Sequence, residues 1–353
     1  MDDVLSVLVK YIFLFLLLAS AALFLFILLR RLAIQHREAV FQVRYLEIEQ
    51  EVLQAIAAGD ISTAVGTALK HRGRPDVLTQ VLVNFTEMIS GRGREVLRTI
   101  FEHALKRRFL KDLRSPFVAR RLRATRLIGL FAASSERALL VDLLRDKPIV
   151  RLAAANALTH VPDKESLALV FEAFEKESSP DIHAYTNIIF GAGQRIEPLV
   201  RVALVKTPSP EKLSLLIELV GAIPLRSLAS LIPGFARHPD KEVRIKSAKA
   251  LAALRSPDSF DVLVELAADK DWEVQAQALR GLGNLRNPEA LEILSKGLFS
   301  PAWHVRWNAR EGLLNLGTEG IRRLEEVAGQ KADRFAADMA RMALDTLRDT
   351  QVN

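Results

Sequence analysis

The 353-residue sequence contains no cysteine, only three tryptophans and three tyrosines, and seven histidines. Without cysteine the chain forms no disulfide, no cysteine-ligated iron–sulfur cluster and no thiol nucleophile. The nearest histidines in sequence, His160 and His183, are too far apart to share a helical face as the ligands of a zinc site do. The sequence also lacks a Walker loop, a glycine-rich dinucleotide fingerprint and a hydrolase elbow. It therefore predicts no catalytic residue, no cofactor and no metal, and we expect a protein that is not an enzyme.

What the chain does contain is a pattern that recurs at a near-constant interval. The fourth, seventh, eighth and eleventh positions after the anchor Val274 are Ala278, Gly281, Leu282 and Leu285. Small residues at the first two positions and large ones at the last two describe a helix face that a neighbouring helix approaches closely. The same pattern follows four other anchors clearly: Val150, Val243, Val305 and, near the C-terminus, Ala336. It follows three more anchors weakly: Arg120, Ile182 and Leu213. Eight such anchors predict an all-α fold, an α-solenoid of about eight helical hairpins.

Each repeat reads as helix, turn, helix, and in the best copy the helices cover residues 258–268 and 272–285. The segments that begin the second helices read DKPIVR at 146–151, DKEVR at 240–244 and HVR at 304–306. These motifs, with the small and large residues that follow, resemble HEAT repeats, in particular the short bacterial type named after phycobilisome (PBS) lyases. The resemblance covers about two-thirds of the chain. It implies that the arginine after the anchor (Arg151, Arg244 and Arg306) contacts the aspartate of a turn.

Residues 11–29 form an uncharged run rich in leucine and phenylalanine. A helix of that length is ~28 Å long, close to the thickness of the hydrocarbon core of a membrane. A cleaved signal peptide is the alternative, but the run continues well beyond the small residues 19–21 and the N-terminus carries Asp2 and Asp3. We therefore expect a retained single-pass transmembrane helix, residues 1–30.

The charges beside this run predict its orientation. Arg30, Arg31, Arg37 and Arg44 follow the run, whereas only Lys10 precedes it. The positive-inside rule then puts the N-terminus outside and residues 30–353 in the cytoplasm, on the inner or plasma membrane.

Three segments are expected after the anchor: a juxtamembrane helix at 31–59, an irregular helical basic cap at 60–114 and the HEAT-like repeat solenoid at 115–353. In the first of these, Ile34, Phe41 and Ile48 recur with heptad spacing. Such spacing suits either a helix that docks on the first repeat or a short coiled-coil seam, which would make a homo-oligomer. Helix breaks are expected at residues 73–75 (GRP) and 91–93 (GRG).

Positive charge is concentrated in residues 70–126, which carry 15 lysines and arginines against five acidic residues. This segment therefore holds +10, and the rest of the chain sums to −3, giving the net charge of +7. A solvated surface, nucleic acid and anionic lipid are three interpretations. The membrane anchor argues against nucleic acid and favours lipid, because each basic residue near an anionic surface contributes about 1 kcal/mol. The predicted lipid contacts are Arg107, Arg108, Arg120 and Arg121.

Two sets of side chains are candidates for binding a partner protein. Trp272 and Trp303 occupy equivalent positions in adjacent repeats, each two before its anchor, and Trp307 follows one turn later. With Arg244, Arg280 and Arg306 they suit protein recognition, in which Trp and Arg dominate. Alternatively, each indole closes the gap between neighbouring repeats.

The second set lies in the two central repeats. At the third and sixth positions after their anchors these repeats carry apolar side chains where other repeats are polar. If these positions face outward, they form a groove for a partner helix; the alternative is irregular packing between two imperfect repeats. The side chains are Tyr185, Ile188, Leu216 and Leu219.

These observations favour a membrane-anchored cytoplasmic scaffold that binds and positions a protein client such as a membrane enzyme. A bilin lyase-like enzyme, which the repeat type implies, and a nucleic-acid-binding solenoid are the alternatives.

Overall fold

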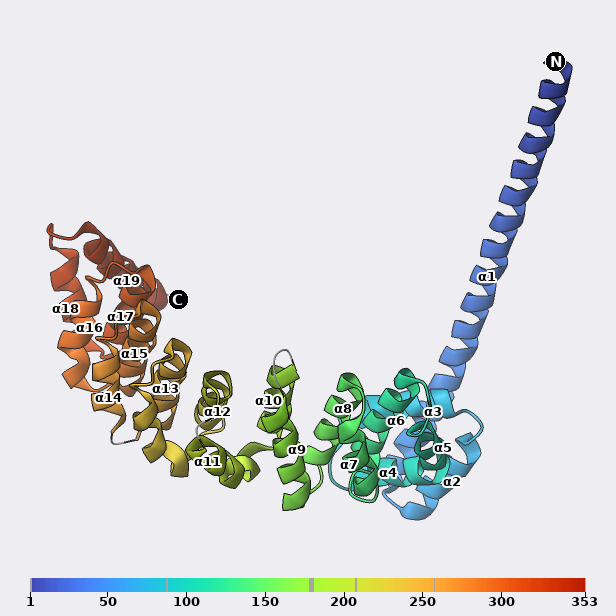
Figure 1. The fold of residues 1–353 in the computed structure, drawn as a ribbon, viewed down its shortest axis with the longest axis horizontal. Coiled ribbons are helices and arrows are strands. Elements are labelled where there is room, and N and C mark those ends of the chain that lie inside the picture. The colour runs from blue at the N-terminus through green and yellow to red at the C-terminus, as the bar shows by residue number, and fades with distance from the viewer. Residues whose placement is uncertain (1, 87, 178–180, 207, 257, 353) are drawn as a thin grey trace. The chain divides into compact units, whose positions relative to one another are not determined.

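The computed structural model describes residues 2–352 except 87, 178–180, 207 and 257; the side chains of residues 2–17, 19, 21 and 349–352 are not described. The chain forms two compact units, Met1–Glu136 and Arg137–Asn353. Both units are helical throughout their described parts (Figure 1).

In its described residues, the first unit consists of one long helix and five shorter ones. Gaps between the short helices include residues 72–74 and 88–91, where the glycine-containing segments predicted breaks. The helices are α1 (Asp2–Ala58), α2 (Ile61–His71), α3 (Pro75–Thr86), α4 (Arg92–Ala104), α5 (Lys106–Asp112) and α6 (Val118–Phe131).

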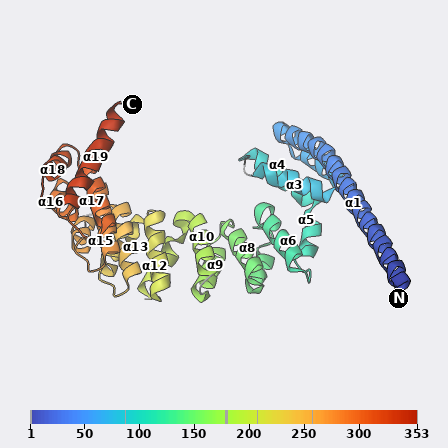
Figure 2. The same cartoon turned by 90° about the horizontal axis from the view of Figure 1, so that it is seen from above.

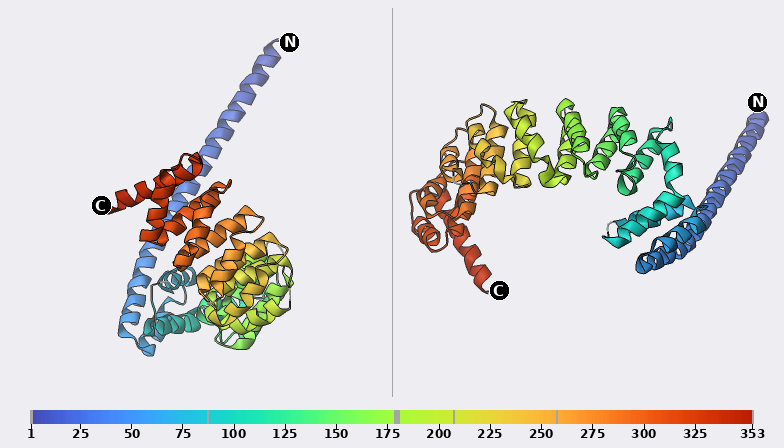
Figure 3. Two further views of the ribbon diagram at one scale, coloured as in Figure 1. Left: turned by 90° about the vertical axis from the view of Figure 1, so that its left-hand side faces the viewer. Right: turned by 90° about the horizontal axis from the view of Figure 1, so that it is seen from below.

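The C-terminal half of α1 packs against α2, α3 and α4 (Figure 3). Ile48, Val52 and Ala55 are fully buried there. Glu51 accepts a hydrogen bond from His71, whose Nε2 lies 2.9 Å from the carboxylate. Ile48 of the heptad series is therefore buried against helices of the segment expected as the cap, and not against the first repeat, whereas Ile34 of the same series is exposed.

The end of α1 follows directly from two residues. Gly59 has φ +64°, a conformation that glycine adopts without strain. Asp60 then caps α2, because its carboxylate accepts a hydrogen bond from the Thr63 amide at 2.7 Å. Hydrogen bonds from the hydroxyl and amide of Thr63 lower the pKa of Asp60 to about 2. This cap is therefore kept at all but strongly acidic pH.

The predicted transmembrane segment, residues 11–29, lies partly outside the described side chains, since those of 11–17, 19 and 21 are not described. Among the residues that are described, no helix has an apolar stretch long enough to cross a membrane.

The second unit contains the remaining helical hairpins. The best repeat forms α14 (Ser259–Leu266) and α15 (Trp272–Leu285), close to the predicted bounds. The other elements are α7 (Arg137–Asp142), η1 (Leu143–Arg145), α8 (Pro148–Thr159), α9 (Lys164–Lys176), α10 (Asp181–Gly191), η2 (Gly193–Ile196), α11 (Glu197–Val205), α12 (Pro210–Ala222), η3 (Arg226–Phe235), α13 (Lys241–Leu254), η4 (Pro288–Ala290), α16 (Leu291–Gly297), α17 (Trp303–Asn315), α18 (Thr318–Ala328) and α19 (Arg334–Val352). Seven of the eight predicted anchors are buried; Arg120, in α6, is exposed.

The second helices of successive repeats pack side by side, and Figure 2 shows α12, α13, α15 and α17 in this order. Small residues set their separation, as the repeat pattern predicted. A Cβ atom built on Gly281 would lie 3.1 Å from Cβ of Ala252, and one on Gly283 would lie 2.4 Å from Cα of Gly312. Thus α15 and α17 approach each other backbone to backbone.

Candidate protein-binding surface

Arg244 holds two consecutive turns together. Its Nη1 donates to the carbonyl oxygens of His238 and Pro239, at 2.9 and 3.0 Å, in the turn before α13. The rest of the guanidinium binds the next turn, with 2.7 Å to the Asp269 carboxylate and 2.6 Å to that of Asp271. The Arg244 side chain is only 6% exposed. Its assignment to a protein-binding surface is therefore wrong, and the structural contact implied by the HEAT resemblance is confirmed.

In other repeats, the side chain at the position directly after the anchor also donates hydrogen bonds to the carbonyls of its own turn. Arg306 donates to the carbonyls six and five residues earlier, at 2.7 and 3.0 Å. Arg121 does the same at 2.8 and 3.1 Å, and Gln275 reaches the carbonyl six residues earlier at 2.5 Å. Arg121 is thus half-buried and engaged in its own turn, which corrects its predicted contact with lipid. Arg151 instead pairs with Glu177 and Asp181, at 2.8 and 3.6 Å.

The three tryptophans form one continuous stack with a histidine, which we call the aromatic row: Trp272, His304, Trp303 and Trp307. The His304 ring stacks on Trp272, with centroids 5.0 Å apart, and meets Trp303 edge-on at 5.1 Å. Trp303 in turn stacks on Trp307 at 5.0 Å. Trp272 and Trp303 are 43% and 48% exposed. The row therefore bridges two repeats and still presents indole surface to solvent.

Arginines accompany the aromatic row. The Arg310 guanidinium lies 3.8 Å from the centroid of Trp307, a cation–π contact. Arg306 lies over the ring of Phe335 at 5.5 Å, and Phe335 is 69% exposed. Arg280 is exposed on α15. Of the three predicted arginines, Arg280 alone is fully on the surface.

The predicted apolar groove in the central repeats is not formed. Tyr185, Leu216 and Leu219 are buried, and Ile188 is half-buried. The helices that carry them are covered on both sides, since α10 packs against α8 and α12, and α12 packs against α10 and α13. Burial raises the pKa of Tyr185 to about 12. Outward orientation was the wrong prediction, because these apolar side chains fill the space between neighbouring second helices.

The remaining predicted lipid contacts, Arg107, Arg108 and Arg120, are exposed on α5 and α6. Arg120 lies over the ring of Phe117 at 5.2 Å, and Phe117 is itself 61% exposed. Arg108 is 3.9 Å from Asp76, a long and exposed ion pair. These three side chains are thus accessible.

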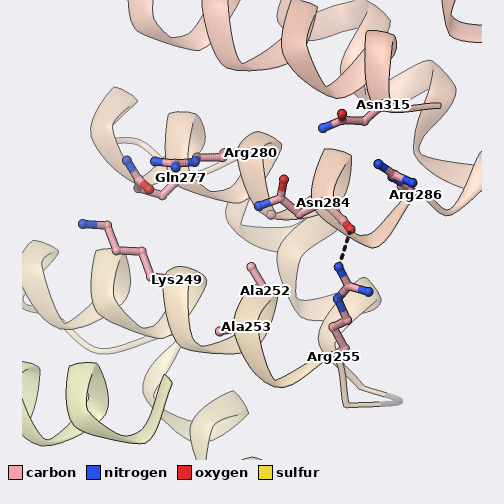
Figure 4. Close-up of a pocket in the computed structure, with 10 residues that line it drawn as sticks. Lys249, Ala252, Ala253, Arg255, Gln277, Arg280, Asn284, Arg286 and Asn315 are labelled. Carbon is pink, nitrogen blue, oxygen red and sulfur yellow. Dashed lines mark hydrogen bonds between the residues drawn. The ribbon is translucent and has the colours of Figure 1, made fainter. Parts of the chain in front are cut away.

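The structure adds a pocket that the sequence did not reveal. It has a volume of about 630 Å³ and lies on α13, α15 and the end of α17 (Figure 4). Figure 4 shows Lys249, Gln277 and Arg280 on one side, Arg286 and Asn315 on the other, and Asn284 between them. A neighbouring pocket of about 470 Å³ shares Arg280, Asn284 and Asn315 and continues to Trp307. A signal existed: Lys249 and Arg280 occupy the sixth position after their anchors, and Asn284 and Asn315 the tenth.

Ligands for a metal are not brought together in the described part of the chain, where no group of three or more His, Asp or Glu side chains is suitably placed. The surface features described above are aromatic rings, cations and amides on adjacent helices.

A known family profile covers the C-terminal repeats. The profile described as HEAT repeats matches residues 197–273 and 263–345. No curated protein sequence matches the chain.

Solved structures with a similar helical arrangement include YibA of Escherichia coli, with 18% identity, 74% of this chain and 98% of that chain covered, and a TM-score of 0.42. The complex of CpcE and CpcF of phycocyanin lyase from Nostoc sp. PCC7120 has 20% identity, 69% and 94% coverage and a TM-score of 0.31. An engineered protein has 18% identity, 85% and 98% coverage and a TM-score of 0.38. Likenesses at this level carry no inference about function. The profile match and the helical hairpins described above identify residues 197–345 as HEAT repeats.

Proposed function

We propose that this protein is a membrane-anchored scaffold whose HEAT repeats bind a client protein through the aromatic row. The observation that carries this proposal is the exposure of Trp272 and Trp303, at 43% and 48%, in a chain that has only three tryptophans. Tryptophan is enriched at binding hot spots because it buries a large apolar area and keeps one polar group. An array without a central pocketed core suits the holding of other molecules. We propose a binding function without catalysis; the alternative functions are a bilin lyase-like activity and nucleic-acid binding.

The double substitution Trp272→Ala and Trp303→Ala is expected to abolish client capture without unfolding the repeats. Truncation of a hot-spot residue costs about 2 kcal/mol or more in binding. Stability should change less than the ~3–5 kcal/mol of a buried tryptophan, because each indole is already half in solvent. Proteins cross-linked to the full-length protein in native membranes would be quantified by mass spectrometry, and the melting temperature measured in parallel.

Phe190→Ala is the matched control, since Phe190 is 48% exposed on α10, away from the aromatic row. The same cross-linked partners should persist in this variant. A large fall in melting temperature of the tryptophan variant, or unchanged partners in a stable one, would assign the row to the packing of adjacent repeats.

The anchoring part of the proposal rests on the apolar character of α1. Residues 22–29 are all apolar and all exposed, so this part of the helix is apolar on every side. A helix of that kind is stable in a protein core or in a membrane. Together with the uncharged run 11–29, this supports a single-pass anchor with the HEAT repeats in the cytoplasm.

A green fluorescent protein fused after Asn353 should fluoresce in bacterial cells, and alkaline phosphatase at the same site should be inactive. The physical reason is the Arg30/Arg31 flank, which is retained on the cytoplasmic side. Exchanging the flanking charges (Asp2→Lys and Asp3→Lys with Arg30→Glu and Arg31→Glu) should shift activity toward the phosphatase fusion. Phosphatase activity in the unaltered protein would refute the topology.

Exposed Arg107, Arg108 and Arg120 belong to the net-positive segment 70–126 and are the side chains that we propose for contact with anionic lipid. Arg121 is excluded from this set because its guanidinium is used in its own turn.

A further inference from the structure

We propose that the pocket between α13, α15 and α17 binds an extended acidic segment of a protein. This inference rests on the proposed scaffold function, because the segment would belong to the client. It adds a second site, chemically different from the aromatic row, and a sequence preference for carboxylate side chains.

The first argument is the charge of the pocket. Lys249, Arg255, Arg280 and Arg286 line it, and no carboxylate does. The neighbouring pocket has one carboxylate in its lining, Glu311, which is paired with Arg310. Apart from residues 70–126 the chain sums to −3, so this cluster is not a consequence of general basicity. A concave surface lined by one sign of charge attracts and concentrates ligands of the opposite sign.

The second argument is the lack of internal partners for three of these cations. Within the described residues, the side chains of Lys249, Arg280 and Arg286 have no ion pair and no hydrogen bond, while the side chain of Arg255 donates only to the Asn284 carbonyl at 3.3 Å (Figure 4). Elsewhere in the same unit, several cations on the array are neutralised across repeats, and others, such as Lys270 and Lys296, are single exposed side chains without an ion pair among the described residues. The neutralised cations include Lys246 with Glu218 at 2.7 Å, Lys241 with Glu273 at 2.6 Å and Arg237 with Glu265 at 2.6 Å. The pocket differs from both cases because three unpaired cations line one concave surface, which leaves their charge available to a ligand.

The third argument is the backbone conformation of two of the arginines. Arg255 and Arg286 end α13 and α15 with φ of 51° and 55°, in the left-handed region. Glycine is the residue that adopts this conformation without strain at a helix end, and other residues cost roughly 1 kcal/mol. The backbone conformation would favour glycine at both equivalent positions. We therefore infer that arginine is present there because its charged side chain lines the pocket.

The shape and the amides of the site favour a peptide. Side-chain amides of Gln277, Asn284 and Asn315 can both donate to peptide carbonyls and accept from peptide N–H groups. The two pockets run across three helices whose axes, at 8–10 Å per pair, span about 16–20 Å. An extended chain covers that distance in about five or six residues. Trp307 at the far end offers an apolar contact beside the cations.

The test uses a hexaglutamate peptide and the full-length protein in detergent at 0.15 M salt. All three tryptophans lie at 272–307 and the basic segment 70–126 has none, so tryptophan fluorescence reports binding near the pocket only. We expect the double substitution Lys249→Glu and Arg280→Glu to raise the Kd for the peptide at least tenfold. Lys249→Gln with Arg280→Gln, which adds no negative charge, should weaken binding in the same direction and serves if the first variant does not fold.

The matched control is Lys270→Glu with Lys296→Glu, since both lysines are exposed in the same unit and do not line either pocket. This control should bind hexaglutamate within twofold of the unaltered protein. An equal loss in the control, equal affinity for a glycine–serine hexapeptide, or competition by inorganic phosphate at the peptide's own concentration would overturn the proposal. Tighter binding of a short DNA duplex, lost in the same pocket variant, would overturn it in favour of nucleic acid.

The two functional proposals can fail separately. The Trp272→Ala and Trp303→Ala variant keeps Trp307 as a reporter and keeps every cation of the pocket. Loss of client capture with retained hexaglutamate binding supports both proposals. Retained client capture in that variant, with peptide binding still dependent on Lys249 and Arg280, refutes the aromatic row and leaves the pocket standing.

Discussion

Replacing Arg244 by alanine is expected to lower the free energy of unfolding of the Arg137–Asn353 unit by about 3–5 kcal/mol, the cost of breaking a buried ion pair from one side. The substitution leaves the carboxylates of Asp269 and Asp271 without the guanidinium that binds both, at 2.7 and 2.6 Å. It also removes the donors to two turn carbonyls. Burial raises the pKa of Asp269, but the hydrogen bonds from Arg244 and from the Asp271 amide more than offset this and hold the pKa below its ordinary value.

The measurement is urea denaturation followed by circular dichroism, with Arg237→Ala as the matched control. Arg237 also forms two hydrogen bonds with one carboxylate, that of Glu265, at 2.6 and 2.8 Å. Its side chain is 80% exposed, so its loss should cost at most about 1 kcal/mol. Equal costs for the two substitutions would show that burial of Arg244 between the turns contributes nothing.

The substitution Gly283→Ala is expected to destabilise the same unit by about 3 kcal/mol, at the upper end of the range for overpacking. The added Cβ would lie 2.4 Å from Cα of Gly312, and backbone on the neighbouring helix cannot move aside as a flexible side chain does. α15 and α17 would therefore have to separate. A lowered urea midpoint measures the effect.

Gly191→Ala provides the control for this prediction. Nothing lies within 4 Å of the Cβ position at Gly191, and its φ is not positive. Alanine at the end of α10 should be neutral or stabilise by up to about 1 kcal/mol, because glycine loses more conformational entropy on folding. A destabilisation of Gly191→Ala similar to that of Gly283→Ala would mean that helix separation is not the cause.

Much of the fold could be predicted from the sequence because its determinants are local and periodic. The positions of α14 and α15 follow from one anchor and its spacing, and the ends of α1 and α2 follow from Gly59 and from the break after His71. The close approach of α15 and α17 was predictable in part: Gly312 stands at the seventh position after its anchor, where the pattern requires a small residue, but Gly283 stands at the ninth, which the pattern did not include.

The functional surface was less predictable, because whether a side chain faces the core or the solvent depends on how the neighbouring repeats pack. Tyr185 and Leu216 occupy the third position after their anchors, where Lys246 and Gln277 are polar and half-buried in other repeats, and the flanking helices bury them. In the sequence Arg121 is one of many basic residues in its segment. Its hydrogen bonds to turn carbonyls identify it as the counterpart of Arg244. The basic pocket depends on cations from different repeats that meet only when the helices stack.

The arginine that joins consecutive turns has a counterpart near the C-terminus with fewer partners. Arg306 binds its own turn, but Lys331 stands where the pattern of Arg244 and Asp269 would place an aspartate. Asp333, the counterpart of Asp271, accepts from the Ala336 amide at the start of α19. The turns are therefore joined by a buried arginine–aspartate pair in the middle of the array, whereas at its end the partly exposed pair of Arg323 with Glu292 and apolar packing hold α18 in place. The interaction free energy between neighbouring repeats therefore differs along the array. We expect α18 and α19 to unfold as a separate cooperative unit while the repeats before them remain folded.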